Sequence, residues 1–128
     1  MRKIETLMNK AISNKTDWNN TNTSVEYHPS ENLSEVRLHG HLIAWYDHKE
    51  NTLGISNCGW ETNTTKSRLN AILSTFYYGV GIFQKNWQWF ISDNRESTNI
   101  STKKWFYNGM IVYSHGLSCM EHHPLVAS

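Results

Sequence analysis

The residues best placed to do chemistry lie in the segment C-G-W-E-T-N-T-T-K-S-R-L-N-A-I-L, residues 58–73. Threonines precede an amphipathic run here, which predicts a helix capped by the hydroxyl of Thr64 or Thr65. Lys66 and Arg68 then fall in the first turn, where the helix dipole already carries partial positive charge. Together with the free backbone N–H groups of that turn, the two cations could bind a phosphate or an acidic side chain.

The same two cations also have a structural explanation. Glu61 precedes the helix and can pair with either cation, which would offset the cost of positive charge at a helix N-terminus. This explanation is narrowly favoured, because threonine caps are common and mostly structural. In both cases we expect Lys66 and Arg68 to be exposed and Trp60 to be buried beneath the turn.

A second candidate site comes from the aromatic residues of the basic second half. Trp87 and Trp89 alternate along a predicted strand, and Lys85, Lys103 and Lys104 flank the aromatic segments. Such a surface could stack single-stranded bases or anchor a protein interface, although a core with incidental exposure is an equal alternative. The candidate binding residues are therefore Lys66, Arg68, Lys85, Trp87, Trp89, Lys103 and Lys104.

Patterns for metal binding and catalysis are weak. The histidines of H-G-H, residues 39–41, could hold zinc if strand pairing brought Cys58 near them. The C-terminal H-x3-C-x2-H-H, which starts at His115, has ligand types but no supporting structure. The sequence contains no nucleophile elbow and no glycine-rich phosphate loop. We therefore predict no enzymatic activity, no catalytic residues, no metal and no cofactor.

Composition limits the class of protein. The 128 residues include 38% hydrophobic residues, six Trp, six Tyr and four Phe, which favours one folded domain. The net charge of +1 argues against a dedicated nucleic-acid binder. No apolar run reaches the length of a membrane span, the first ten residues lack the apolar core of a signal peptide, and two cysteines do not suggest a disulfide framework. These features predict residence in the cytoplasm.

The elements that must position the candidate residues are indicated by hydrophobic periodicity. A period near 3.6 predicts an N-terminal helix over residues 4–12, followed by a loop over 14–24. Alternation then predicts the strands V-E-Y-H, S-E-V-R-L-H, L-I-A-W-Y-D and T-L-G-I-S-N, which form an antiparallel meander with one wet face. The apolar stripe at positions 69, 72, 73 and 76 predicts a central helix packed on that sheet.

The second half of the sequence predicts further strands at V-G-I-F-Q and W-Q-W-F-I. Asn108-Gly109 is the strongest short hairpin signal and predicts a closing β-hairpin around it. The fold class is therefore α+β, with one domain over residues 1–114 and a tail over 115–128.

The central segment resembles a family of small phage and prophage proteins, a domain-of-unknown-function family. The resemblance lies in L-H-G-x-x-I-A, in C-G-W-x-T-x-T-T-K-x-R-L-N-A and in Q-K-x-x-W-F, and it spans roughly residues 4–110. It implies a phage-encoded, non-enzymatic accessory protein of the host cytoplasm. Such a protein would bind and modulate a host or phage protein, for example in host takeover or against CRISPR or restriction. The alternative is a nucleic-acid binder, and the oligomeric state is open.

Overall fold

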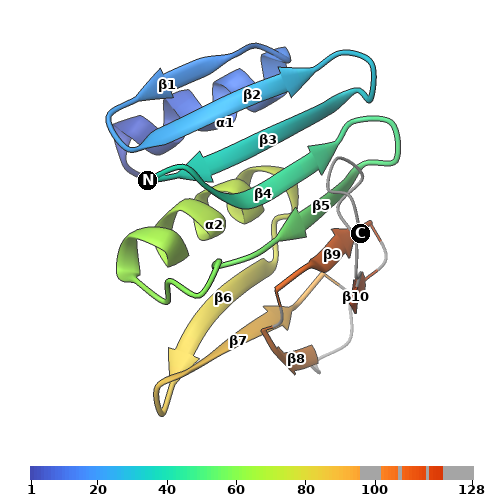
Figure 1. The fold of residues 1–128 in the computed structure, drawn as a ribbon. Coiled ribbons are helices and arrows are strands. Elements are labelled where there is room, and N and C mark those ends of the chain that lie inside the picture. The colour runs from blue at the N-terminus through green and yellow to red at the C-terminus, as the bar shows by residue number, and fades with distance from the viewer. Residues whose placement is uncertain (96–101, 107, 115, 120–128) are drawn as a thin grey trace.

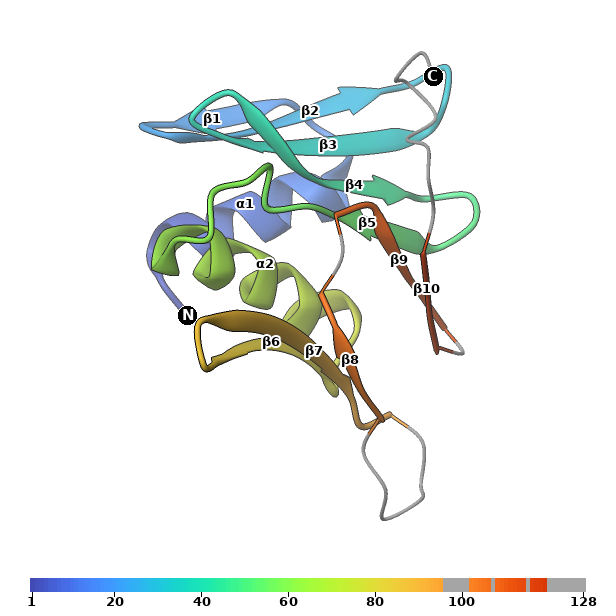
Figure 2. The same cartoon turned by 60° about the horizontal axis from the view of Figure 1, so that its bottom comes forward.

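The computed structural model describes residues 1–95, 102–106, 108–114 and 116–119, with only the backbone described at 102–105, 118 and 119. Both helices cover one face of a seven-stranded antiparallel sheet, and a three-stranded antiparallel sheet packs on the second helix from its other side (Figures 1 and 2). The strand orders are β1-β2-β3-β4-β5-β9-β10 and β6-β7-β8. The predicted α+β class, with its meander, two helices and a C-terminal hairpin, is confirmed, although the hairpin is formed by other residues than predicted. Neither described helix is long and apolar enough to cross a bilayer.

In sequence order the elements are α1 (Lys3–Asn14), β1 (Trp18–Asn20), β2 (Thr23–His28), β3 (Leu33–Leu38), β4 (His41–Asp47), β5 (Thr52–Ile55), α2 (Asn63–Phe76), β6 (Val80–Lys85), β7 (Gln88–Asp93), β8 (Thr102–Trp105), β9 (Met110–Tyr113) and β10 (Gly116–Cys119).

The predicted meander corresponds to β2, β3, β4 and β5. Val25, Val36, Ala44 and Ile55 are direct cross-strand neighbours, and all four are buried on the face that the helices cover. The predicted loop over 14–24 is partly wrong, since β1 pairs there with β2. This strand is short and mostly polar, so it has no apolar alternation from which it could be predicted, and it is defined by its backbone pairing with β2.

The opposite face of the meander is less wet than predicted. Trp45 is buried and lies over Gly54, where an added Cβ would stand 1.9 Å from the indole ring. Glu35, which pairs with Trp45 on this face, is only 4% exposed.

The two helices run parallel to each other. Glu5, near the start of α1, contacts Ser67 and Arg68 near the start of α2, and Asn9 contacts Ala71 one turn further along. Both helices therefore begin at the same end of the molecule (Figure 2). The predicted α2 stripe is confirmed, with positions 69, 72 and 73 fully buried and 76 partly buried.

The small sheet packs on the far side of α2. The Asn70 side chain accepts a hydrogen bond from the backbone N–H of Ile82 at 2.7 Å and donates to its carbonyl at 2.9 Å. These two bonds fix β6 along the helix, so the β6–β7 turn returns to the end where α2 begins (Figure 1).

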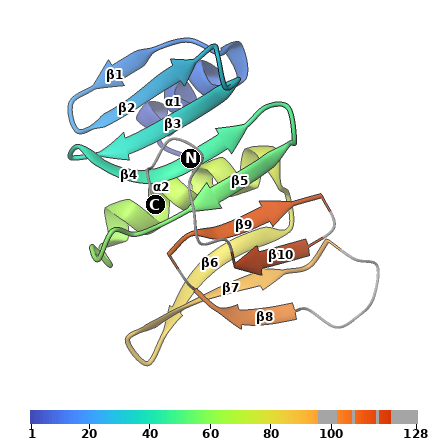
Figure 3. The same cartoon turned by 45° about the vertical axis from the view of Figure 1, so that its right-hand side comes forward.

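The hairpin predicted at Asn108-Gly109 is wrong. β8 pairs with β7, whereas β9 pairs with β5 and β10, so these two residues connect different sheets (Figure 3). Gly109 has a φ of 87° and donates from its N–H to the Ile55 carbonyl. The C-terminal hairpin is instead β9–β10, in which Tyr113 pairs with Gly116, so its second strand lies in the segment predicted as a tail.

Candidate functional site

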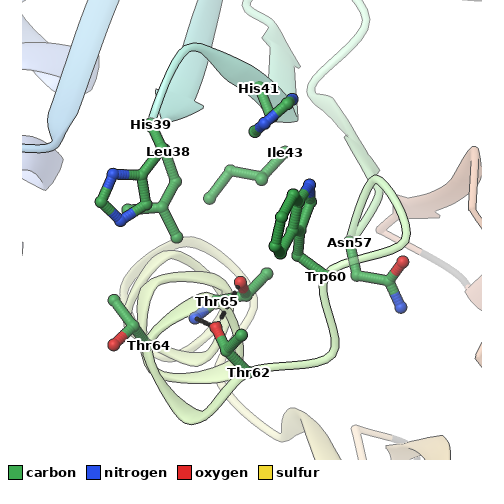
Figure 4. Close-up of a pocket in the computed structure, with 9 residues that line it drawn as sticks. All are labelled: Leu38, His39, His41, Ile43, Asn57, Trp60, Thr62, Thr64 and Thr65. Atoms are coloured by element: carbon green, nitrogen blue, oxygen red, sulfur yellow. Dashed lines mark hydrogen bonds between the residues drawn. The ribbon is translucent and has the colours of Figure 1, made fainter.

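A cavity of about 420 Å³ opens between the β3–β4 turn, the loop after β5 and the first turn of α2 (Figure 4). Its lining combines an apolar floor with polar and aromatic walls. The lining residues are Leu38, His39, His41, Ile43, Asn57, Trp60, Thr62, Thr64 and Thr65. They contain no carboxylate, lysine or arginine.

The β3–β4 turn shapes one side of this cavity. His39 and Gly40 have φ values of 52° and 81°, the left-handed pair that two-residue hairpin turns require. A register shift after Val36 inserts an extra residue into β4, and such a bulge re-aims nearby side chains. Leu38 and Ile43 are 4% and 1% exposed and form the floor.

The loop after β5 presents Trp60 to solvent, and the prediction that Trp60 is buried is wrong. Its side chain is 56% exposed, and its ring centroid lies 5.6 Å from that of His41. The residues before Trp60, and not Trp60 itself, anchor this loop to the rest of the protein. The N–H of Asn57 donates to the Asn108 side chain at 2.9 Å, and the Cys58 thiol donates to the Leu42 carbonyl at 2.8 Å.

The helix cap lies two or three residues before the predicted positions. Thr62 has an extended backbone, and its hydroxyl accepts from the Thr65 N–H at 3.1 Å, so Thr62 is the N-cap rather than Thr64 or Thr65. All of the threonines in T-N-T-T can cap a helix, and the direction in which the loop enters α2 selects the first. The cap and first turn of α2 form the polar wall of the cavity.

Arg68 is not a surface cation, which corrects the prediction for this residue. It is 4% exposed, its Nη1 lies 2.8 Å from Glu5 Oε2, and its Nε donates to the Thr23 hydroxyl at 3.0 Å. Glu61 is exposed and is not the partner of Arg68. Arg68 therefore joins α1, α2 and β2 and leaves the set of binding candidates.

Glu5 is the acidic partner in this buried pair. Burial alone would raise the pKa of Glu5, but hydrogen bonds from Ser67 and Arg68 outweigh it and hold the pKa below its ordinary value. The Ser67 hydroxyl donates to Glu5 Oε2 at 2.6 Å. No sequence pattern pointed to this pair, because Glu5 and Arg68 are 63 residues apart.

The two tryptophans of the predicted aromatic strand have opposite environments. Trp87 lies in the β6–β7 turn with Asn86, both at positive φ, and is 87% exposed. Trp89 is 3% exposed and packs edge-on against Phe106, so it belongs to the core and is not a binding residue. The prediction that both tryptophans alternate along one strand is wrong, because β7 begins at Gln88 and Trp87 lies in the turn before it.

The remaining candidates are lysines. Lys66 is half-buried and its Nζ donates to the Gln84 side chain at 3.4 Å, while Lys85 is exposed next to the β6–β7 turn. Lys103 and Lys104 lie on β8, and their side chains fall outside the described part of the structure.

We call one end of the molecule the helix-start end: the starts of α1 and α2, the His39–Gly40 turn, residues 56–62 and the Asn86–Trp87 turn (Figures 1 and 2). It carries the cavity, the exposed Trp60 and Trp87, and the positive ends of two parallel helix dipoles. The cations at the surface of this end include Arg2, Lys3, Lys66 and Lys85, and Arg37, whose Nη1 donates to the Gly40 carbonyl at 3.3 Å. Glu61 is an exposed acid at the same end.

The histidine group that the structure brings together is not the predicted one. Within the described ranges, the group whose possible ligand atoms come within 4.8 Å of one another is Glu26, His28 and Glu35. His28 Nε2 lies 3.0 Å and 2.8 Å from the two carboxylates, which are hydrogen-bonding distances. An Arg37 nitrogen 3.5 Å from Glu35 adds a protein cation to this group.

Comparison with known proteins identifies the origin of this sequence. A family model described as Kyanoviridae Gp96 protein matches residues 1–113. The chain belongs to this family. It is therefore a phage protein, as the resemblance implied, and the Kyanoviridae Gp96 match includes the cavity, Trp60 and Trp87. No curated protein and no solved structure matches the sequence.

Proposed function

We propose that this member of the Kyanoviridae Gp96 family is a non-enzymatic accessory protein that binds and modulates a host or phage protein in the host cytoplasm. Its interface is the helix-start end. The observation that carries this proposal is the exposure of Trp60 and Trp87 at 56% and 87% on the same end as a well-formed cavity.

Trp87 has no structural reason to be where it is. A bulky residue with a φ of 65° is unfavourable in a turn that asparagine or glycine would fill more easily. Its exposed ring stabilises little, since it buries little apolar surface. Tryptophan is, however, among the residues that contribute most to protein interfaces. A binding role accounts for both its position and its exposure.

Trp60 has a similar position on the other side of α2. Its loop is fixed by hydrogen bonds at Asn57 and Cys58, so the ring is presented on a rigid support. A preorganised side chain loses less conformational entropy on binding than a mobile one. The two tryptophans can therefore act as anchors within one interface.

The test is capture of partners from infected host lysate with tagged protein, quantified by mass spectrometry. We expect Trp60→Ala and Trp87→Ala to lose the enriched proteins, with stability within about 0.5 kcal/mol of wild type because the side chains are at the surface. Tyr78→Ala is the matched control, since Tyr78 is 87% exposed beyond the opposite end of α2. The proposal fails if no protein is enriched, or if both tryptophan variants capture as much as wild type.

One form of modulation would be inhibition of a host defence such as restriction or CRISPR immunity. Plaque counts of a sensitive phage on defended cells that express the protein would measure it. We expect plating to rise with the wild-type protein and with Tyr78→Ala, and to stay low with Trp87→Ala. An equal rise with the wild type, Tyr78→Ala and Trp87→Ala would show that the effect on plating does not depend on this surface.

Nucleic-acid binding is the second candidate, favoured by the cations of the helix-start end, which lie on the same end as the exposed Trp60 and Trp87. It ranks below protein binding because the net charge is only +1 and Arg68 is committed to a buried ion pair. A phosphate-dominated complex must weaken steeply with salt. The absence of a gel shift on single- and double-stranded probes at low salt would remove this candidate.

A further inference from the structure

We propose that the outer face of the seven-stranded sheet, which is the face away from the helices, is the docking surface for residues 120–128 of this same chain. These residues lie outside the described part of the structure. The inference concerns a different surface from the helix-start end, so it is independent of the proposed function.

One row of cross-strand neighbours runs across this outer face. The row follows the register of six strands and consists of Glu26, Glu35, Trp45, Gly54, Ile111 and the position of Ser118. Side chains alternate between the two faces along a strand. Since Val36 points to the helices, its neighbour Glu35 and the rest of this row point away from them.

The middle of the outer row is shielded from solvent. Trp45 is 7% exposed and Ile111 is 8% exposed. Gly54 accounts for the contact on only one side of the Trp45 ring. Leu33 lies two residues before Glu35 on the same face and is fully buried. An uncovered face of an antiparallel sheet is solvated, so this face must be covered.

Strand β3 shows the same feature in its pattern of burial. Its first four residues, Leu33–Val36, are all buried, although consecutive residues of a strand point to opposite faces. A strand with this pattern is covered on both sides. The helices cover one side, and the cover on the other side must come from elsewhere.

The described helices and strands do not provide this second cover. Both helices and the three-stranded sheet lie on the opposite face of the large sheet (Figure 2). Residues 96–101 belong to the connection between β7 and β8, two strands of the three-stranded sheet. Residues 120–128 instead follow β10, a strand of the large sheet itself.

The segment 120–128 is long enough to cross the outer face. The outer row ends at Ser118 and β10 ends at Cys119, so the chain leaves the sheet beside this row. Four strand spacings separate β10 from β3, or about 19 Å in total. Nine extended residues span about 30 Å, so the chain can reach β3 by about residue 125.

The composition of the segment fits the surface that it would cover. Its sequence is M-E-H-H-P-L-V-A-S, so Leu125 and Val126 fall at the distance of β3, where Leu33 and Trp45 require apolar cover. Pro124 has no N–H and cannot pair regularly as a strand. A segment that crosses the strands and packs through its side chains has no need of such pairing.

Hydroxyl-radical footprinting of the full chain, quantified by mass spectrometry, tests this docking. In the wild type we expect Trp45 to be oxidised as slowly as the core residue Trp89 and far more slowly than the exposed Trp87. Leu125→Asp combined with Val126→Asp should raise the oxidation of Trp45 about 5-fold, because an uncovered sheet face is solvated. Trp89 should stay protected, which shows that the variant is folded.

The matched control adds the same two charges elsewhere. Asn19→Asp combined with Asn20→Asp places them on β1, at the far edge of the sheet, where both residues are exposed. This variant should leave the oxidation of Trp45 unchanged. If the Asp variant of the segment unfolds, as increased oxidation of Trp89 would show, NMR of the wild type decides. We expect nuclear Overhauser effects between the methyl groups of Leu125 or Val126 and the Trp45 ring.

Three outcomes would overturn the inference. Oxidation of Trp45 in the wild type at the rate of Trp87 would mean that the face is open and awaits another partner. Equal protection of Trp45 in the wild type and in a folded Asp variant would mean that this segment is not the cover. Overhauser effects that arise only between differently labelled copies in a mixed sample would assign the cover to a second copy. None of these results affects the capture experiment with Trp87→Ala.

Discussion

The clearest test of the structural role of Arg68 is its replacement by methionine. Arg68→Met keeps most of the side-chain volume but removes the charge that pairs with Glu5 at 2.8 Å. Both side chains are nearly inaccessible, at 4% and 2% exposure for the residues. The variant therefore leaves a buried carboxylate beside Ser67 without its cation.

The expected cost follows from this burial. Removal of one partner from a buried ion pair typically costs about 3–5 kcal/mol, because the remaining charge has lost its solvation and its partner. The Thr23 hydroxyl also loses the donor at 3.0 Å, which acts in the same direction. For a domain of ordinary stability, about 5–15 kcal/mol, this is a large fraction of the total.

The loss should depend on pH. In the wild type the pKa of Glu5 is lowered, so this carboxylate contributes stability above its unfolded pKa, about 4.3, and the contribution disappears as the pH falls through the folded pKa. In Arg68→Met the burial that raises the pKa remains while a main cause of its lowering is gone. The difference in stability between the two proteins should therefore be largest near pH 7 and shrink toward pH 4.

Urea unfolding followed by tryptophan fluorescence at both pH values measures these differences. Arg37→Met is the matched control, because Arg37 is 38% exposed and lies 3.5 Å from its carboxylate, so it should cost no more than about 1 kcal/mol. Glu5→Leu combined with Arg68→Met should recover about half or more of the loss, since an apolar pair can replace a buried ion pair. A loss below about 1 kcal/mol for Arg68→Met, equal at both pH values, would refute the reasoning.

Three further predictions concern single contacts. Gly54→Ala should cost about 2 kcal/mol or more by thermal unfolding, because its Cβ would stand 1.9 Å from the Trp45 ring, and Trp45→Leu in the same protein should relieve part of this loss. Thr62→Ala should lower stability by about 1 kcal/mol through loss of the N-cap, whereas Thr64→Ala should stay within about 0.5 kcal/mol of wild type. A larger loss for Thr64→Ala than for Thr62→Ala would show that Thr64 is the cap, as the sequence predicted. Burial raises the pKa of Tyr77, whose hydroxyl donates to the Asn51 carbonyl at 2.9 Å. The difference between the absorbance titrations of wild type and Tyr77→Phe should therefore show no phenolate from this residue at pH 10, where a free tyrosine is about half ionised. Ionisation near pH 10 would contradict its burial.

The candidate site was only partly visible in the sequence. The segment around Thr62–Lys66 was recognised because cap residues before an amphipathic run are a local signal. The cavity next to it was not predicted, because Leu38 and Ile43 reach it through a bulge and a hairpin turn far away in the sequence. Trp60 was misplaced for the same reason: its exposure depends on contacts of Asn57 and Cys58 with β4 and with Asn108.

Local periodicity by itself determined the α+β class, both helices and the four strands of the meander, because each pattern of apolar residues matches only one backbone repeat. It also determined the buried stripe of α2. Only the tertiary structure decided what Arg68 does, because its partner lies 63 residues away. Pairing of β9 with β5 likewise overrode the local turn signal at Asn108-Gly109. Such choices depend on which distant surfaces meet and exclude water, and no short window of sequence contains that information.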